Sequence, residues 1–581
     1  MKKLQGISAS QGIVIGKVFF YLDEYLRVPE YKVSPEEVGS EIERFEAAVE
    51  KTRGELVQLK KSLNKDGGIT ETGIIDAHLL MLDDPELSKQ IKTRVKDELN
   101  NVEWALYEVV KSYIEILKMS SDEYLKERTY DIRDVAQRLL GNLLYKSRVD
   151  LKDLKEEVIL VAHELLPSAT LSMDKRMVKG IATDAGGKTS HTAILARAFE
   201  IPAVLGLSHI TAEVRNGDQI IIDGTSGMVI VRPDQDTLES YERKLQLWQK
   251  KEVELLNLNM LAAETRDGKK ILLQANIEVP EETDSALSHG ADGIGLYRSE
   301  FFFLEPGKLA TEEEQYQAYS QVLSSMENLA VTIRTIDLGG DKMLPGTAYL
   351  EESNPILGWR SIRFCMSMKD IFRTQLRALL RASVHGKLRI MFPMISGVEE
   401  LDQVLAFYDD VRRECDNEGV RFDHNIPLGI MIEVPSAALT ADILARKVKF
   451  FSIGTNDLIQ YTIAVDRGNE KIAYLYEPFH PGVLRLLRMI IEGAHSQSIP
   501  VAMCGEMAGD PYMAVILLGL GLDVFSMSSF SIPEIKNIIR SVSLVQAEEL
   551  VGTIFEMKSY KEIDRFVKGW MNERFEYLRQ Q

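Results

Sequence analysis

From about residue 268 onward, short apolar runs alternate with longer stretches of helical spacing. Eight such runs are present, at residues 271–276, 293–297, 330–335, 388–394, 428–432, 449–453, 500–503 and 523–527. Eight β/α units over roughly 300 residues are typical of a (β/α)8 TIM barrel. The sequence therefore predicts such a barrel over residues 263–581. Its fourth strand is the least well marked, because the long stretch 338–387 before it begins like a loop.

Polar side chains stand where these strands end, which is where a TIM barrel carries its active site. They are Asn276, Arg298, Arg334, Glu433, Asn456, Asp457 and Cys504. Four arginines and one lysine belong to the same part of the chain, namely Arg298, Arg334, Arg360, Arg467 and Lys342. Each arginine alone is typical of a surface salt bridge. Together they favour a ligand with several negative charges, because guanidinium groups bind carboxylate and phosphate bidentately.

Glu433 and Asp457 are two carboxylates on adjacent strand ends, with no histidine or cysteine cluster nearby. Oxygen ligands facing a phosphate suit Mg²⁺ better than Zn²⁺. For Asp457 the alternative is ordinary capping of the next helix. Cys504 is either a small buried hydrophobic residue or, beside a cationic site, a proton donor or nucleophile.

A second chemical feature is the stretch from Gly186 to Arg197, with His191 at its centre. Gly186 and Gly187 permit a tight turn, and the following hydroxyl residues are typical N-caps. The expected helix places His191 near a positive helix end that favours anions. An imidazole there can attack phosphorus and carry a phosphoryl group. The alternative is a histidine that merely fills a turn.

The first half of the chain divides into three parts. Residues 1–20 with 149–230 are expected to form one discontinuous α/β domain around His191, and residues 21–148 an all-helical insertion. The insertion's charges are either a solvated face or an acidic docking face that includes Asp83, Asp84 and Glu86. Residues 231–262 are expected to be a linker helix that lets the His191 domain swing.

Composition limits the function classes. The formal charge of −19 argues against nucleic acid and permits a basic protein partner. Three cysteines without a CxxC pair favour a reducing compartment. We expect a cytoplasmic protein without membrane insertion, because no signal peptide or membrane-length apolar run is present. Neither a P-loop nor a GxGxxG motif supports a nucleotide site.

The chain closely resembles the phosphoenolpyruvate–protein phosphotransferases, enzyme I of the bacterial sugar phosphotransferase system. The resemblance extends over the whole chain in one order. Its motifs are residues 186–197, 451–467, 333–342, 358–360, 124–128 and 503–506. Either of the first two alone would indicate only the wider phosphoenolpyruvate-utilising group.

The resemblance implies a role for each matching residue. It implies that His191 is phosphorylated by phosphoenolpyruvate and that Cys504 donates the proton that completes pyruvate. Glu433 and Asp457 are then the Mg²⁺ ligands. The implied substrate-binding residues are Arg298, Arg334, Asn456, Arg467, Arg360 and Lys342. The helical insertion would dock the histidine-containing carrier protein HPr, with Arg128 and Asp83–Glu86 as docking residues, and the barrel would form a homodimer.

Two departures and two alternatives remain. Lys188 stands where the family usually has arginine, and Gln11 where it has proline.

A pyruvate,phosphate dikinase or phosphoenolpyruvate synthase shares the mobile histidine and the barrel, but it needs an ATP-binding domain. The helical insertion is too small for one. A non-catalytic docking scaffold is the other alternative, and the intact set of polar residues argues against it.

Overall fold

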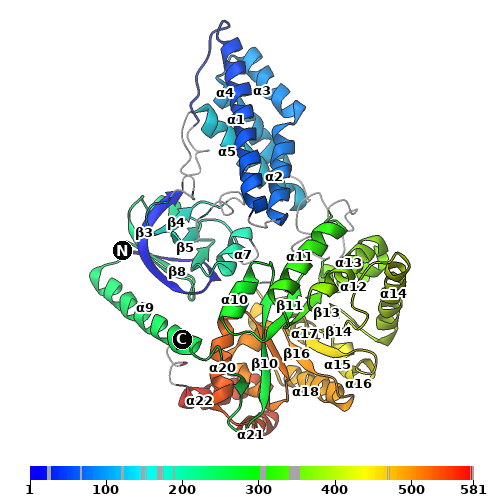
Figure 1. Cartoon of the computed structure of the whole chain (residues 1–581). Helices are drawn as coiled ribbons and strands as arrows, with labels where there is room; N and C mark the ends of the chain where they lie inside the picture. Colours follow the sequence, from blue (N-terminus) through cyan, green and yellow to red (C-terminus); the bar gives the residue numbers. More distant parts are fainter. Residues whose placement is uncertain are drawn as a thin grey trace. The chain divides into compact units, whose positions relative to one another are not determined.

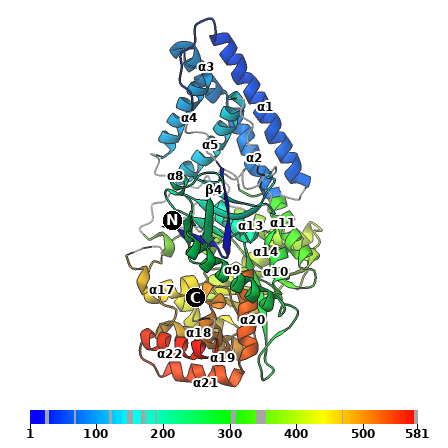
Figure 2. The same cartoon turned by 90° about the vertical axis from the view of Figure 1, so that its left-hand side faces the viewer.

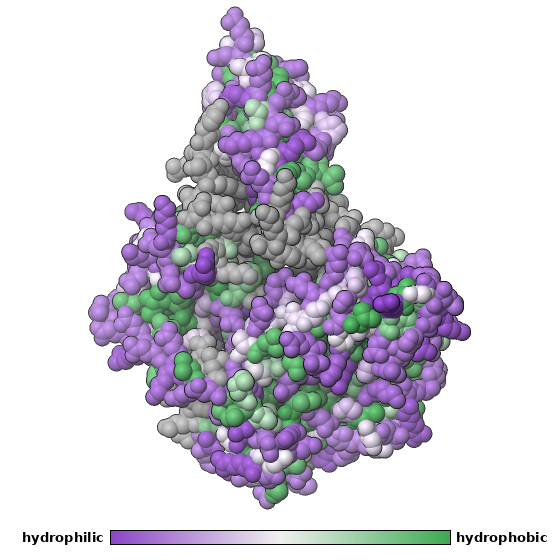
Figure 3. Space-filling view, viewed as in Figure 1, coloured by the Kyte–Doolittle hydropathy of each residue, from purple (hydrophilic) through white to green (hydrophobic). Residues whose placement is uncertain are grey.

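We analysed a computed structural model of the chain. It describes residues 1–21, 28–65, 69–118, 123–144, 151, 154–165, 173, 176–187, 190–300, 309–338, 354–467, 469, 471–575 and 578. The chain forms two compact units, Met1–Gln249 and Lys250–Gln581, each with its own cores. The surface seen in Figure 3 is mostly hydrophilic, with hydrophobic residues scattered across it. Among the described residues, no helix combines the length and apolar character needed to span a bilayer.

The first unit contains a sheet of eight strands in the order β1-β8-β7-β3-β4-β5-β6-β2. The strands are β1 Lys2–Gln5, β2 Ile7–Ser10, β3 Ile13–Tyr21, β4 Val158–Ala162, β5 Val178–Thr183, β6 Ala203–Leu205, β7 Gln219–Asp223 and β8 Met228–Val231. Strand β3 is parallel to β4 and antiparallel to β7, so the first residues of the chain complete a sheet built mainly from residues after 157. The apolar run at residues 13–20 predicts the third of these N-terminal strands, whereas the first two were not predicted.

In the described part of the stretch between β3 and β4, five helices form a bundle (Figure 1). They are α1 Val38–Lys65, α2 Ile69–Leu82, α3 Pro85–Glu98, α4 Val102–Lys118 and α5 Glu123–Leu143. Buried aliphatic residues at helical spacing, such as Ile91 and Val95 of α3, make its core. The all-helical insertion that the sequence predicts is therefore present.

Helix α9, Gln235–Leu256, connects the two units along the chain. Its first turns pack on the sheet, where Tyr241 and Leu238 meet Ile221 and Ile230. The predicted linker is thus a single helix whose N-terminal half is fixed by apolar contacts to the first unit.

The second unit is a closed parallel barrel with helices around it (Figures 1 and 2). Its strands are β10 Lys270–Ile277, β11 Gly293–Arg298, β12 Ala330–Arg334, β13 Lys387–Phe392, β14 Leu428–Ile432, β15 Phe450–Ile453, β16 Val501–Met503 and β17 Val524–Met527. Strand β10 pairs with both β11 and β17, which closes the ring. All eight predicted strands are present, and their ends differ from the prediction by at most two residues.

The helices between and after the barrel strands supply its outer layer. They are α10 Glu282–Ser288, α11 Glu312–Ser325, α12 Ser361–Ser367, α13 Lys369–Ala382, α14 Val398–Asn417, α15 Pro435–Leu439, α16 Ala441–Leu444, α17 Thr455–Ile463, α18 Pro481–Ser496, α19 Pro511–Gly519, α20 Ile532–Ser541, α21 Leu544–Phe555 and α22 Tyr560–Arg574. Strand β9, Ala263–Glu264, pairs antiparallel with the start of β10.

Candidate active site

The C-terminal ends of the barrel strands bring most of the predicted site residues together. Arg298 and Arg334 are the last residues of β11 and β12, while Glu433 and Cys504 directly follow β14 and β16. Asn456 and Asp457 lie in the first turn of α17, which follows β15. Lys342 lies outside the described residues.

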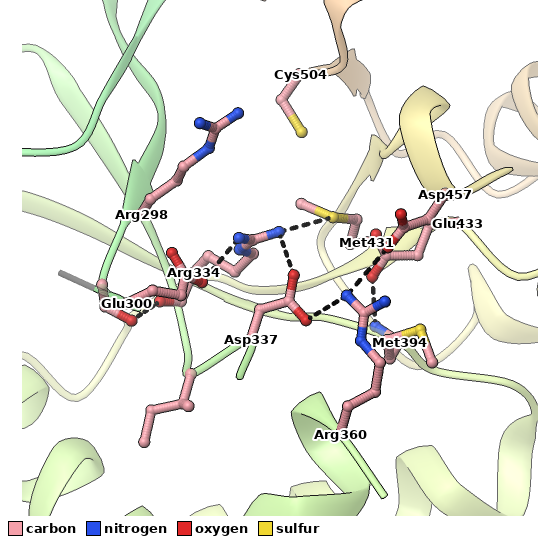
Figure 4. Close-up of polar contacts among 12 residues, drawn as sticks. Arg298, Glu300, Arg334, Asp337, Arg360, Met394, Met431, Glu433, Asp457 and Cys504 are labelled. Atoms are coloured by element: carbon pink, nitrogen blue, oxygen red, sulfur yellow. Dashed lines mark hydrogen bonds and ion pairs between the residues drawn. The ribbon is translucent and has the colours of Figure 1, made fainter. Parts of the chain in front are cut away.

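A chain of buried charges crosses this end of the barrel. Asp337 accepts from Arg334 through Oδ2 at 2.8 Å and from Arg360 through Oδ1 at 3.1 Å. Arg360 also reaches Oδ2 of Asp457 at 3.2 Å, and Arg334 reaches Glu300 at 2.7 Å. Figure 4 shows Asp337 held between the two guanidinium groups. The arginine side chains are only 11% and 14% exposed, so they are not surface salt-bridge residues.

The two guanidinium groups determine the charge of Asp337. Burial opposes ionisation, but the positive charges of Arg334 and Arg360 hold the pKa of Asp337 at about 2. The carboxylate is therefore ionised at neutral pH and fixes both guanidinium planes before any ligand arrives. Such preorganisation is how enzymes direct charged groups at a reacting phosphate.

Glu433 is almost fully buried, at 2% exposure, and accepts from the backbone N–H of Met394 at 2.6 Å. Burial, and then the charges of Asp337 and Asp457, raise the pKa of Glu433 to about 8. Gly454 makes this position possible, since a Cβ there would lie 2.7 Å from Oε2 of Glu433.

The capping alternative for Asp457 is wrong. The N-cap of α17 is Gly454, and the Asp457 carboxylate is paired with Arg360 instead. Asp457 and Glu433 place two carboxyl groups at this end of the barrel. Among the described residues, no group of three or more histidine, cysteine or carboxylate side chains is placed to hold a metal. Two carboxylates nevertheless fit Mg²⁺, which keeps water or substrate oxygens as its other ligands.

Cys504 is 4% exposed and lies within hydrogen-bond reach of Ser452, whose Oγ is 3.2 Å from Sγ. Burial raises the pKa of the thiol, while the Ser452 hydrogen bond and the charge of Arg334 oppose that change. In Figure 4 the thiol and the guanidinium groups of Arg298 and Arg334 point toward a common space. A thiol that keeps its proton suits an acid better than a nucleophile.

The remaining predicted ligand residues lie at the rim. Arg298 forms an ion pair with Glu278. Glu506 contacts both Asn456, through the amide at 3.4 Å, and Arg467, whose Nη1 lies at 3.7 Å. Arg467 is 46% exposed, so an anion can reach it from solvent.

His191 is the first residue of α7, His191–Ala198, as the sequence predicts. Ser190 is the N-cap, and its Oγ accepts from the N–H of Ala193 at 3.3 Å. Gly186 has φ of 110°, a conformation that glycine adopts readily. The side chain of His191 lies outside the described part of the chain, as do Lys188 and the side chain of Arg128.

The acidic stretch of the helical bundle has structural roles. Asp84 caps α3 by accepting from the N–H of Glu86 at 2.8 Å, and Asp83 pairs with Arg53 at 2.5 Å. These contacts explain the conformation of the stretch without a partner. They leave Glu86, which is more than half exposed, facing solvent.

Sequence reasoning assigned no role to Asp337, Glu300 or Ser452. Asp337 stands three residues after Arg334, just beyond the strand end, and that position was a usable signal. No sequence signal identified Glu300 or Ser452, because only the closed barrel brings them beside Arg334 and Cys504.

Comparisons with known proteins agree across the chain. Three family models match: PEP-utilising enzyme, N-terminal, at residues 5–128; PEP-utilising enzyme, mobile domain, at 154–227; and PEP-utilising enzyme, PEP-binding domain, at 252–544. A phosphoenolpyruvate-protein phosphotransferase of Priestia megaterium is 45% identical over 98% of this chain and 99% of its own. That of Bacillus subtilis (strain 168) is 43% identical over the same shares. A solved structure of an Enzyme I protein is 43% identical over 42% of this chain and 99% of its own, with a TM-score of 0.36.

Proposed function

The chain belongs to the phosphoenolpyruvate-protein phosphotransferases and is an enzyme, and on that premise we propose that it moves the phosphoryl group of phosphoenolpyruvate to its own His191. The group then passes to the histidine of the carrier protein HPr, and pyruvate is released, as the first step of sugar uptake by the phosphotransferase system. The buried arrangement of Arg334, Asp337, Arg360 and Asp457 beside Cys504 is the observation that carries this proposal.

The arginines bind the substrate. Asp337 holds Arg334 and Arg360 in place, so their binding of the phosphate and carboxylate would need little further ordering. Arg298, Asn456 and Arg467, with Lys342, complete the proposed set. Glu433 and Asp457 would hold Mg²⁺, which when bound neutralises charge on the phosphate and on the departing enolate.

The chemistry is a displacement at phosphorus followed by protonation. An imidazole nitrogen of His191 forms the N–P bond as the P–O bond to the enol oxygen breaks, and the electron pair leaves with that oxygen. Cys504 donates its proton to the methylene carbon of the resulting enolate, which gives pyruvate. Solvent then reprotonates the thiolate. The raised pKa of Cys504, caused by burial, supports this role.

His191 must reach both the phosphoenolpyruvate site and HPr, so the domain that carries it must move. We propose that residues 1–20 with 149–230 form the domain that carries His191 and that it swings on the linker 231–262. The helical insertion 21–148 would dock HPr, and the barrel unit 263–581 would bind phosphoenolpyruvate and form a homodimer in the cytoplasm. His191 would face the barrel when it receives the phosphoryl group and HPr when it transfers that group.

The proposal is tested by labelling. Radiolabelled phosphoenolpyruvate with Mg²⁺ should give an acid-labile, base-stable adduct on the wild-type chain, and the label should pass to added HPr. His191→Ala should abolish the adduct. His209→Ala is the matched control, because His209 is exposed and makes no side-chain cap hydrogen bond. Equal labelling of His191→Ala would refute the proposal, and labelling from ATP would favour a dikinase.

A further inference from the structure

The start of the barrel strands, opposite to the proposed active site, carries a cavity of about 550 Å³. Residues before or at the beginning of β13 to β16 line it, and we call it the strand-start cavity. Its lining residues are Arg389, His424, Asn425, Ile426, Pro427, Lys449, Phe450 and Pro500. Its volume lies within the range of about 300–1,000 Å³ that is usual for small-molecule sites.

The cavity is separate from the active site. Pro427 lines it, whereas Glu433 lies six residues further along β14 at the other end of the barrel. At about 3.3 Å per residue, the two ends are roughly 20 Å apart. The ring of Phe450 fills part of the interior between them, because Gly429 lacks the side chain that would collide with it; a Cβ there would lie 2.5 Å from the ring.

The charged side chains that line the cavity are basic. No carboxylate is among its lining residues, while Arg389 and Lys449 supply two positive charges. His424 lies 3.9 Å from Asp416, which is not among the lining residues. Within the described ranges, neither Arg389 nor Lys449 has a carboxylate partner in any ion pair.

Arg389 differs from the arginines of the active site in this respect. Arg334 and Arg360 are buried against carboxylates, whereas the Arg389 guanidinium lies over the face of Phe450, at 5.7 Å from the ring centre. Arg389 is half-buried, and burial lowers its pKa. Without a carboxylate partner among the described residues, its guanidinium has hydrogen-bond donors left for an anionic ligand.

We propose that the strand-start cavity binds a small anionic molecule, whose carboxylate or phosphate group is held by the guanidinium of Arg389 and the ammonium of Lys449. The fork of Arg389 can receive such a group bidentately. Lys449 is exposed at the entrance and adds a point charge. The proposal is independent of the function proposed for the candidate active site at the other end of the barrel.

The full-length chain is titrated with inorganic phosphate and, separately, with citrate, without Mg²⁺ or phosphoenolpyruvate. The readout is the imidazole NMR signal of His424, assigned with His424→Gln among the nine histidines. We expect a saturable shift with at least one probe, and the probe that binds identifies the source of the anionic group. Arg389→Gln should weaken binding by about 10- to 100-fold, as expected for loss of charged hydrogen bonds.

Three variants make the result decisive. Arg413→Gln is the matched control, an arginine on α14 whose side chain is 68% exposed, and it should leave the titration unchanged. Arg334→Gln alters the barrel mouth and should also leave the His424 titration unchanged, which separates this site from the proposed active site. If Arg389→Gln does not fold, Lys449→Gln should still weaken binding. Unaltered affinity in both cavity variants, or no saturable shift with either probe, would overturn the proposal.

Discussion

Replacing Asp337 by asparagine tests whether the buried carboxylate holds the arginines of the candidate active site in place. Asp337→Asn keeps the size of the side chain but removes the charge between Arg334 and Arg360. One amide oxygen can still accept from one guanidinium, but the amide N–H₂ then faces the other, donor against donor. We expect lower stability of the barrel and weaker binding of phosphoenolpyruvate.

The pKa of Asp337 gives the magnitude. A pKa of about 2 in place of 3.8 corresponds to about 2–3 kcal/mol of stability at neutral pH. Because the folded pKa is depressed, this contribution is present above the unfolded pKa and is lost as pH falls from about 4 toward 2. The stability difference between wild type and Asp337→Asn should therefore be full at pH 7 and shrink below about pH 4.

The assay must report on the barrel alone, because a chain of two units need not unfold in one step. Hydrogen exchange of barrel peptides at increasing urea concentration gives the free energy of unfolding for that unit. The control is Asp370→Asn, which removes a fully exposed partner of Arg373 and should cost less than about 1 kcal/mol. Equal effects of the two substitutions at pH 7, or a difference that is undiminished at about pH 2, would refute the reasoning.

Three further predictions concern the proposed chemistry. Cys504→Ala should slow pyruvate release by about 10²- to 10⁴-fold with little change in phosphoenolpyruvate binding, measured by rapid quench and by equilibrium titration; unchanged turnover would mean another acid. Gly454→Ala should raise the Mg²⁺ concentration needed for half-maximal labelling, since its Cβ would displace the Glu433 carboxylate, whereas Gly569→Ala, with open space at the Cβ position, should not. Removal of Mg²⁺ by a chelator should abolish labelling of His191 and weaken phosphoenolpyruvate binding; labelling that survives would exclude a metal role for Glu433 and Asp457.

Much of the fold could be predicted because its signals are local. Apolar runs of strand length separated by helical stretches gave all eight barrel strands, and Gly186 with Ser190 marked the start of α7. The strands Lys2–Gln5 and Ile7–Ser10 were missed, because they are short and partly exposed. Their strand conformation depends on pairing with β8 and β6, which lie about 200 residues further along the chain.

The site could be predicted only in part, for a related reason. The strand-end rule places Arg334, Glu433 and Cys504 at one end of the barrel without any knowledge of their contacts. Partnerships between side chains from different strands are not written in any local pattern. Thus the prediction included the arginines but not Asp337 and Glu300, which pair with them, and it weighed helix capping for Asp457 when its partner is Arg360.

The balance of charge at the C-terminal ends of the barrel strands indicates that the carboxylates there do more than pair with the arginines. Four described arginines belong to the proposed substrate-binding set, Arg298, Arg334, Arg360 and Arg467, and each has a carboxylate partner. Six carboxyl groups surround them: Glu278, Glu300, Asp337, Glu433, Asp457 and Glu506. Among these described residues negative charge is in excess, and the raised pKa of Glu433, which burial and its acidic neighbours cause, reflects that excess. A phosphoenolpyruvate anion would enter such a site at an electrostatic cost unless a divalent cation entered with it. The arginines therefore provide orientation, and on the proposed function the favourable charge must come from the metal that Glu433 and Asp457 are placed to hold.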